Sequence, residues 1–177
     1  MTRALGALVL LALLSFIPAA WASHTGPCSG CASHKEWPNV NGIIKKGKSG
    51  SVTYKGTKRN DELLGHHGSD VLSGRAGSDI LWGDWDPVGQ PESQNDLIFG
   101  GDGNDFIYAS HGRNVINAGA GNDAISAHYG RGIVDCGPGQ DIYHVPKSLK
   151  KAYKVKNCET VDRRSERQRG GGLRPLP

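Results

Sequence analysis

The sequence predicts a solenoid of short β-strands. The prediction depends on a nine-residue repeat in which three positions keep the same kind of residue from unit to unit. The repeat is clearest in GGDGNDFIY (100–108), and it recurs in nine units that begin at residues 56, 65, 74, 91, 100, 109, 118, 127 and 136. The fourth position is glycine in seven units, and the sixth is Asp in seven. The eighth is apolar or aromatic in all nine. A period of nine over this length is typical of a solenoid.

Acidic residues are concentrated in these repeats. Residues 60–146 contain three basic and thirteen acidic residues, a net charge of −10, although the whole chain carries +4. Aspartates in register along a solenoid stack in columns, where they repel one another unless a cation lies between them. The repeat offers oxygen ligands and has no Cys or His in the same columns. Such ligands favour a hard divalent ion, and calcium is the leading candidate.

The repeat resembles the G-G-x-G-x-D-x-U-x nonapeptide of the repeats-in-toxin, or haemolysin-type, calcium-binding proteins. The units at 65, 74, 100, 118 and 136 follow this pattern closely, and the other four are degenerate. The resemblance implies an all-β fold, a parallel β-roll (a right-handed β-solenoid) with N- and C-terminal caps. Each unit is then half a turn: six positions form a loop, and three form a strand whose middle side chain points into the core. Glycine suits such loops because it accepts positive φ and has no Cβ.

The resemblance also implies where calcium binds, between loops two units apart. The ligands would be loop carbonyls and the sixth-position carboxylates, which are Asp61, Asp70, Asp79, Asp96, Asp105, Asp123 and Asp141. Position 3, occupied by Asp102 in the unit at 100, is expected to offer only its carbonyl.

The segment GDWDPVGQ (83–90) interrupts the repeat with eight residues and leaves two registers open. In our first interpretation it makes an irregular half-turn. One edge of the roll then carries Asp61, Asp79, Asp96, Asn114 and Gly132, and the other carries Asp70, the inserted loop with Asp84 and Asp86, Asp105, Asp123 and Asp141. In the alternative, the segment lies outside the turn count, and the units before it exchange edges.

Composition divides the chain into five segments. Residues 1–22 have the pattern of a secretory signal, with Arg3, an apolar run and a small-residue cleavage site ending at Ala22. Residues 23–55 are expected to form an N-terminal cap that includes a strand pair, and 56–144 the roll. Residues 145–162 are the expected C-terminal cap, and 163–177 a disordered basic tail. Few aromatic residues are present, so we expect calcium binding to supply folding free energy that a small core cannot.

The four cysteines form two pairs in the sequence. In an exported chain, Cys136 and Cys158 are expected to form a disulfide that clamps the last turn, with 158–162 as a final strand in the nonapeptide frame. Cys28 and Cys31 are expected to form a local disulfide. A zinc or redox site with the nearby His24 and His34 stays open for this pair, although a single C-x-x-C is weak evidence.

The predicted function is that of a secreted, extracellular, non-catalytic calcium-binding protein. Its histidines share no column, and no G-x-S-x-G motif occurs. Calcium is the expected cofactor, and we expect no nucleic-acid partner and no membrane span. Three alternatives stay open. They are a small secreted hydrolase, an extracellular ligand-binding module that uses loop 83–90 with Trp82 and Trp85, and a module whose basic ends bind anionic polymers. The sequence identifies no protein or glycan partner.

Overall fold

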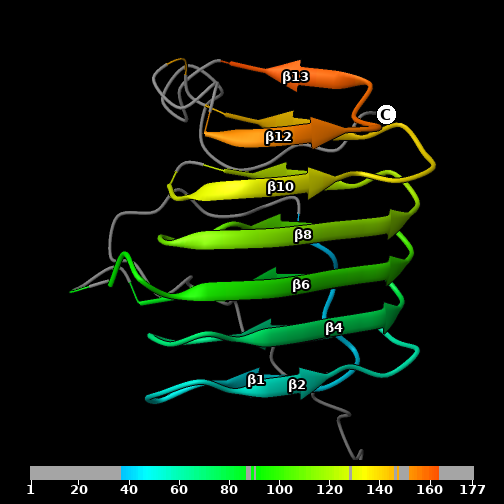
Figure 1. The fold of residues 1–177 in the computed structure, drawn as a ribbon. Coiled ribbons are helices and arrows are strands. Elements are labelled where there is room, and N and C mark those ends of the chain that lie inside the picture. Colours follow the sequence, from blue (N-terminus) through cyan, green and yellow to red (C-terminus); the bar gives the residue numbers. More distant parts are fainter. Residues whose placement is uncertain are drawn as a thin grey trace, which may run out of the picture.

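The structure, a computed structural model, describes residues 37–86, 89, 91–127, 129–145, 147 and 152–163. In these residues it is an all-β solenoid whose strands stack in two parallel sheets (Figure 1), as the sequence predicted. The expected signal at 1–22, the pair Cys28 and Cys31, and residues 164–177 of the expected tail lie outside the described residues. No helix in the described residues is long and apolar enough to cross a membrane.

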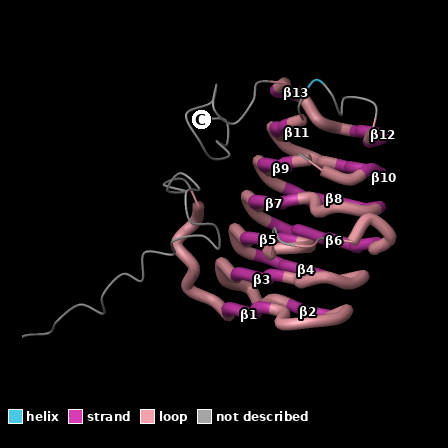
Figure 2. The backbone as a smooth tube through the Cα atoms, turned by 90° about the vertical axis from the view of Figure 1, so that its left-hand side faces the viewer, coloured by secondary structure: helices cyan, strands magenta, loops and turns pink. Residues whose placement is uncertain are grey.

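Successive strands alternate between the two sheets (Figure 2). In spatial order, the seven-stranded sheet contains β1 (Ile44–Lys46), β3 (Glu62–Leu64), β5 (Ile80–Trp82), β7 (Phe106–Tyr108), β9 (Ala124–Ser126), β11 (Ile142–His144) and β13 (Thr160–Asp162). The six-stranded sheet contains β2 (Thr53–Lys55), β4 (Val71–Ala76), β6 (Asn95–Asp102), β8 (Arg113–Ala120), β10 (Arg131–Asp135) and β12 (Tyr153–Lys156). Each strand therefore pairs with the strand two units away.

The strand pairing decides the register of the inserted segment. Strand β5 pairs with β7, and β4 pairs with β6, so 83–94 connects β5 to β6 without adding a described strand to either sheet. Our first interpretation, in which 83–90 makes a half-turn, is therefore wrong, and the alternative is correct. The physical reason is that GDWDPVGQ has no apolar residue at the eighth position of the frame, so it cannot contribute to the core ladder.

The core is a ladder of one inward side chain per strand. The eighth-position residues are all fully or almost fully buried; they are Leu63, Leu72, Leu81, Ile98, Ile107, Ile116, Ile125, Val134 and Tyr143. Small side chains at the first position, such as Ala109, Ala118 and Ala127, fill the space beside them. This ladder confirms the role predicted for the eighth position.

Glycine at the fourth position allows successive loops to stack backbone against backbone. Gly103 and Gly121 have φ angles of 128° and 139°. A Cβ added at Gly121 would overlap the carbonyl oxygen of Gly103, and one at Gly103 would overlap that of Gly77. Both the positive φ and the close approach therefore exclude other residues without a backbone shift.

The nine-residue frame extends beyond the nine units on the N-terminal side. Ile44 pairs with Glu62 and Thr53 with Val71, an offset of 18 residues in each case. Strands β1 and β2 do not pair with each other; each lies at the edge of a different sheet. The residues expected to cap the N-terminal end thus continue the roll by one strand in each sheet.

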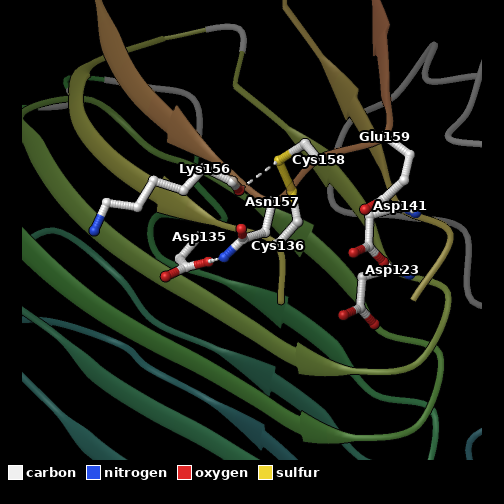
Figure 3. Close-up of a disulfide and its surroundings, with 8 residues drawn as sticks. All are labelled: Asp123, Asp135, Cys136, Asp141, Lys156, Asn157, Cys158 and Glu159. Carbon is white, nitrogen blue, oxygen red and sulfur yellow. Dashed lines mark hydrogen bonds between the residues drawn. A yellow bond between two sulfur atoms is a disulfide. The ribbon is translucent and has the colours of Figure 1, made fainter. Parts of the chain in front are cut away.

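A disulfide closes the C-terminal end. Cys136, which follows β10, is bonded to Cys158, which precedes β13, with a Cα–Cα distance of 5.2 Å (Figure 3). Beside it, the Asn157 side chain donates a hydrogen bond to Asp135 (2.8 Å). The expected pairing of these two cysteines is present.

Removing this clamp should destabilise the last turn. The disulfide joins residues with a sequence separation of 22. Because it reduces the entropy of the unfolded chain, a loop of this length should add about 3 kcal/mol to the free energy of unfolding. The double variant Cys136→Ser/Cys158→Ser should therefore unfold at lower urea concentration and need more calcium to fold. The matched control is Cys28→Ser/Cys31→Ser, measured alongside. Equal midpoints for the first variant and the unchanged protein would contradict a stabilising clamp.

Candidate metal centre

One edge of the roll carries a continuous column of carboxylates. Its members precede the strands of the seven-stranded sheet and are Asp61, Asp79, Asp105, Asp123, Asp141 and Glu159. The five aspartates are buried. Glu159 was not predicted, although it stands 18 residues after Asp141 and so in the frame. The upper end of the column, from Asp123 to Glu159, lies beside the disulfide (Figure 3).

A regular hydrogen-bond ladder fixes one oxygen of each carboxylate. The backbone N–H of Asp105 donates to Oδ1 of Asp123, and the N–H of Asp123 donates to Oδ1 of Asp141, both at 2.8 Å. The same bond joins Asp61 to Asp79 and Asp79 to Asp105, and Asp141 donates to Glu159. The column is therefore held rigidly by the backbone of the preceding coil.

The second oxygen of four of these carboxylates has no hydrogen-bond partner. The Oδ2 atoms of Asp79, Asp105, Asp123 and Asp141 are buried and accept no hydrogen bond. A buried, unsatisfied carboxylate oxygen is costly. A bound cation would satisfy these oxygens, because a carboxylate oxygen donates a lone pair to a metal ion.

Backbone carbonyls converge on the same positions. A Cβ added at Gly100 would overlap both Oδ2 of Asp105 and the carbonyl oxygen of Ala118 in the next coil. One added at Gly74 would overlap Oδ2 of Asp79 and approach the carbonyl of Gly100 to 2.6 Å. The first-position glycine thus lets a carboxylate oxygen and a backbone carbonyl oxygen lie close together. This donor set suits Ca²⁺, which binds carboxylate and carbonyl oxygens.

The electrostatics of the column also favour a cation. Burial raises the pKa of Asp105 to about 8, and the charges of Asp123, Asp79 and Asp102 add to the rise. Burial and the Asp141 charge raise the pKa of Asp123 to about 7. Burial and the Asp61 charge raise the pKa of Asp79 to about 6. A divalent ion among these groups would remove the cause of the like-charge repulsion.

Asp61, at the N-terminal end of the column, differs from its neighbours. Its Oδ2 accepts hydrogen bonds from the backbone N–H and the hydroxyl of Thr57, and its Oδ1 accepts one from Ile43. Both oxygens are therefore satisfied within the protein. Asp61 stays a candidate ligand, but the structure supports it less than the four aspartates that follow.

The opposite edge carries only two of the predicted aspartates. Asp70 accepts from the backbone of Val52 and His66, and Asp96 accepts from the backbone of Asp70 and from the Ser110 hydroxyl. Further along this edge the column ends, because Asn114 and Gly132 occupy the sixth position. Asp70 and Asp96 are thus buried and internally bonded, without a free second oxygen.

The fifth position carries a second ladder that the sequence reasoning missed. Side-chain oxygens here accept the backbone N–H of the fifth residue in the next coil, as Asn104 does from Asn122 and Asn122 does from Gln140. Asn60 and Ser78 act in the same way towards Ser78 and Asn104. The signal was the recurrence of Asn, Ser and Gln immediately before the sixth-position Asp.

One of the comparisons with known proteins agrees with this geometry. A family model for the RTX calcium-binding nonapeptide repeat (4 copies) matches residues 55–86 and again 92–125. The chain therefore carries RTX calcium-binding nonapeptide repeats, which bind Ca²⁺. Neither a search of curated proteins nor one of solved structures found a match.

Asp123 should be the most sensitive position of the column. It is bonded to Asp105 on one side and to Asp141 on the other, so its replacement removes a ligand from two neighbouring spaces. Asp123→Asn should raise the calcium concentration at the folding midpoint more than Asp61→Asn does. Asp102→Ala, at the exposed third position, is the control and should change the midpoint little. The measurement is calcium-dependent circular dichroism. Equal effects of Asp102→Ala and Asp123→Asn would refute this ligand assignment.

The pH dependence of the folding stability should reverse when calcium is bound. Without calcium, the raised pKa values of Asp105 (about 8) and Asp123 (about 7) contribute stability at low pH that is lost as the pH rises from the ordinary carboxyl pKa of 3.8 to these values. With calcium, the carboxylates must be ionised, so stability should rise over the same interval. The folded fraction from far-ultraviolet circular dichroism between pH 5 and pH 8, in chelator and in calcium, tests this expectation. Parallel pH trends in the two media would contradict it.

Proposed function

We propose that this protein is a secreted calcium-binding β-roll that folds on calcium binding and has no catalytic activity. The observation that carries the proposal is the row of buried Oδ2 atoms without hydrogen-bond partners on Asp79, Asp105, Asp123 and Asp141. These four aspartates are the proposed principal ligands, and Asp61, Asp70 and Asp96 are secondary candidates.

Dependence on calcium follows from the energetics of the column. Without a cation, folding must bury carboxylates that repel one another and whose second oxygens accept no hydrogen bond. The core that opposes this cost is thin, with one inward side chain per strand. Because the unfolded chain has no preformed site, the free energy of calcium binding acts as free energy of folding.

Secretion is supported by two independent features. Residues 1–22 have the composition of a secretory signal, and a disulfide joins Cys136 to Cys158. Disulfides persist in oxidising compartments and are rare in the cytosol. Extracellular calcium is then available to the column after export.

We base the proposal that the protein is not an enzyme on the nature of its repeats. RTX β-rolls are generally non-catalytic modules, and the repeats fill most of the described chain. Trp82, which the sequence left open as part of a ligand surface, stacks on Tyr108 with ring centroids 4.6 Å apart. It packs with Trp37 and Val40 against the outer side of the seven-stranded sheet, and this contact gives it a structural role.

Calcium removal should unfold the protein at neutral pH. In excess chelator, far-ultraviolet circular dichroism should show mostly coil, and calcium at about 1 mM, in the range of extracellular calcium modules, should restore the β signal. Magnesium at the same concentration is the control, because it prefers a strict octahedral geometry with several waters. A spectrum and melting temperature that do not change in chelator would overturn the proposal.

A further inference from the structure

The inserted loop builds a cluster of histidine and carboxylate side chains that the calcium column does not use. It brings Asp84 and Asp86 against His66 and His67, which precede β4. Nε2 of His66 lies 3.8 Å from Oδ2 of Asp86, and Nδ1 of His67 lies 3.7 Å from Oδ1 of Asp84. His66, His67 and Asp86 can each present one ligand atom such that all three lie within 4.8 Å of one another.

Several contacts hold this cluster in place. The indole N–H of Trp85, between the two aspartates, donates to the carbonyl of Gly47 (3.0 Å). Its ring lies 5.7 Å from that of His66, and Nζ of Lys46 lies 3.4 Å from its centroid. On the other side, the backbone N–H of His66 donates to Asp70 (3.0 Å). The insertion is therefore anchored to the roll at the point where its carboxylates meet the histidines.

The donor set differs in kind from that of the column. Calcium takes oxygen ligands almost only, whereas imidazole nitrogens favour zinc and other divalent transition metals. Two imidazoles and one carboxylate are a known zinc ligand set with one position open for water or an external ligand. Nδ1 of His66 and of His67 is shielded from solvent and makes no hydrogen bond in the structure, so ring nitrogens remain to be satisfied.

We propose that His66, His67 and Asp86 form a second metal site, which binds a divalent transition-metal ion of the zinc class. Asp84, whose side chain is fully buried, lies 3.7 Å from Nδ1 of His67, where it would orient the ring once the histidine binds a metal, as carboxylates commonly do for metal-binding histidines. The eight-residue insertion then has a chemical role: it brings the carboxylates of Asp84 and Asp86 to the two histidines. This site is separate from the calcium column.

The test is a zinc titration of the secreted protein in saturating calcium, so that the oxygen sites are filled. Isothermal calorimetry should show one zinc equivalent. Because Cys28 and Cys31 could bind zinc independently, all proteins carry Cys28→Ser/Cys31→Ser. His67→Ala should weaken zinc binding by more than the about 10–100-fold that loss of an orienting partner typically costs. His111→Ala is the matched control, since His111 stacks on Tyr129 (4.4 Å between ring centroids) outside the cluster, and it should leave the affinity unchanged.

Two further variants keep the result interpretable. Asp86→Asn, on the inserted loop, should weaken zinc binding as His67→Ala does, and Asp84→Asn should weaken it about 10-fold. Calcium-dependent circular dichroism should be unchanged for Asp86→Asn, and this distinguishes a lost zinc site from a misfolded roll. If the Cys-free protein binds no zinc, or if His67→Ala and Asp86→Asn bind it as tightly as His111→Ala, the site does not exist. Failure of the calcium titration itself would instead contradict the proposed function.

Discussion

The structure depends on how the negative charge of a buried column of carboxylates is balanced. Each aspartate of the column gives one oxygen to the backbone of the preceding coil, which fixes the spacing and rotation of successive coils. The other oxygen is left without a protein donor in Asp79, Asp105, Asp123 and Asp141. The hydrogen bonds that order the column thus leave one buried oxygen of each of these four carboxylates for the proposed calcium ions.

The rest of the coil is adapted to this arrangement. Each nine-residue unit gives one large inward side chain, so the apolar ladder from Leu63 to Tyr143 is continuous but thin. Fourth-position glycines such as Gly121 let loops approach until carbonyl oxygens meet the Cα of the next coil. A parallel solenoid of this kind leaves open ends, where Val155 and Val161 are partly exposed. The disulfide between Cys136 and Cys158 secures the C-terminal end.

The inserted loop shows how a repeat protein can add chemistry without breaking its register. Because 83–94 leaves the turn count unchanged, Asp79 and Asp105 remain neighbours in the column and are joined by a hydrogen bond of 2.8 Å. The additional residues fold back on the β1–β2 connection through Trp85 and Gly47. The column therefore stays continuous, while the loop presents Asp84 and Asp86 to two histidines from another unit.

The sequence by itself determined the repeat, the three-residue strands of the seven-stranded sheet, the inward ladder and the pairing of Cys136 with Cys158, because each follows from a local pattern or a fixed spacing. It also identified the sixth-position aspartates as a set. It did not predict that strands of the six-stranded sheet, such as β6 and β8, extend to eight residues over positions expected to be loop. Only the tertiary structure decided which aspartates share an edge, because a period of nine does not say whether an irregular segment counts as a half-turn; strand pairing does. The approach of His66 and His67 to Asp86 likewise depends on how the insertion folds back, which no periodicity encodes.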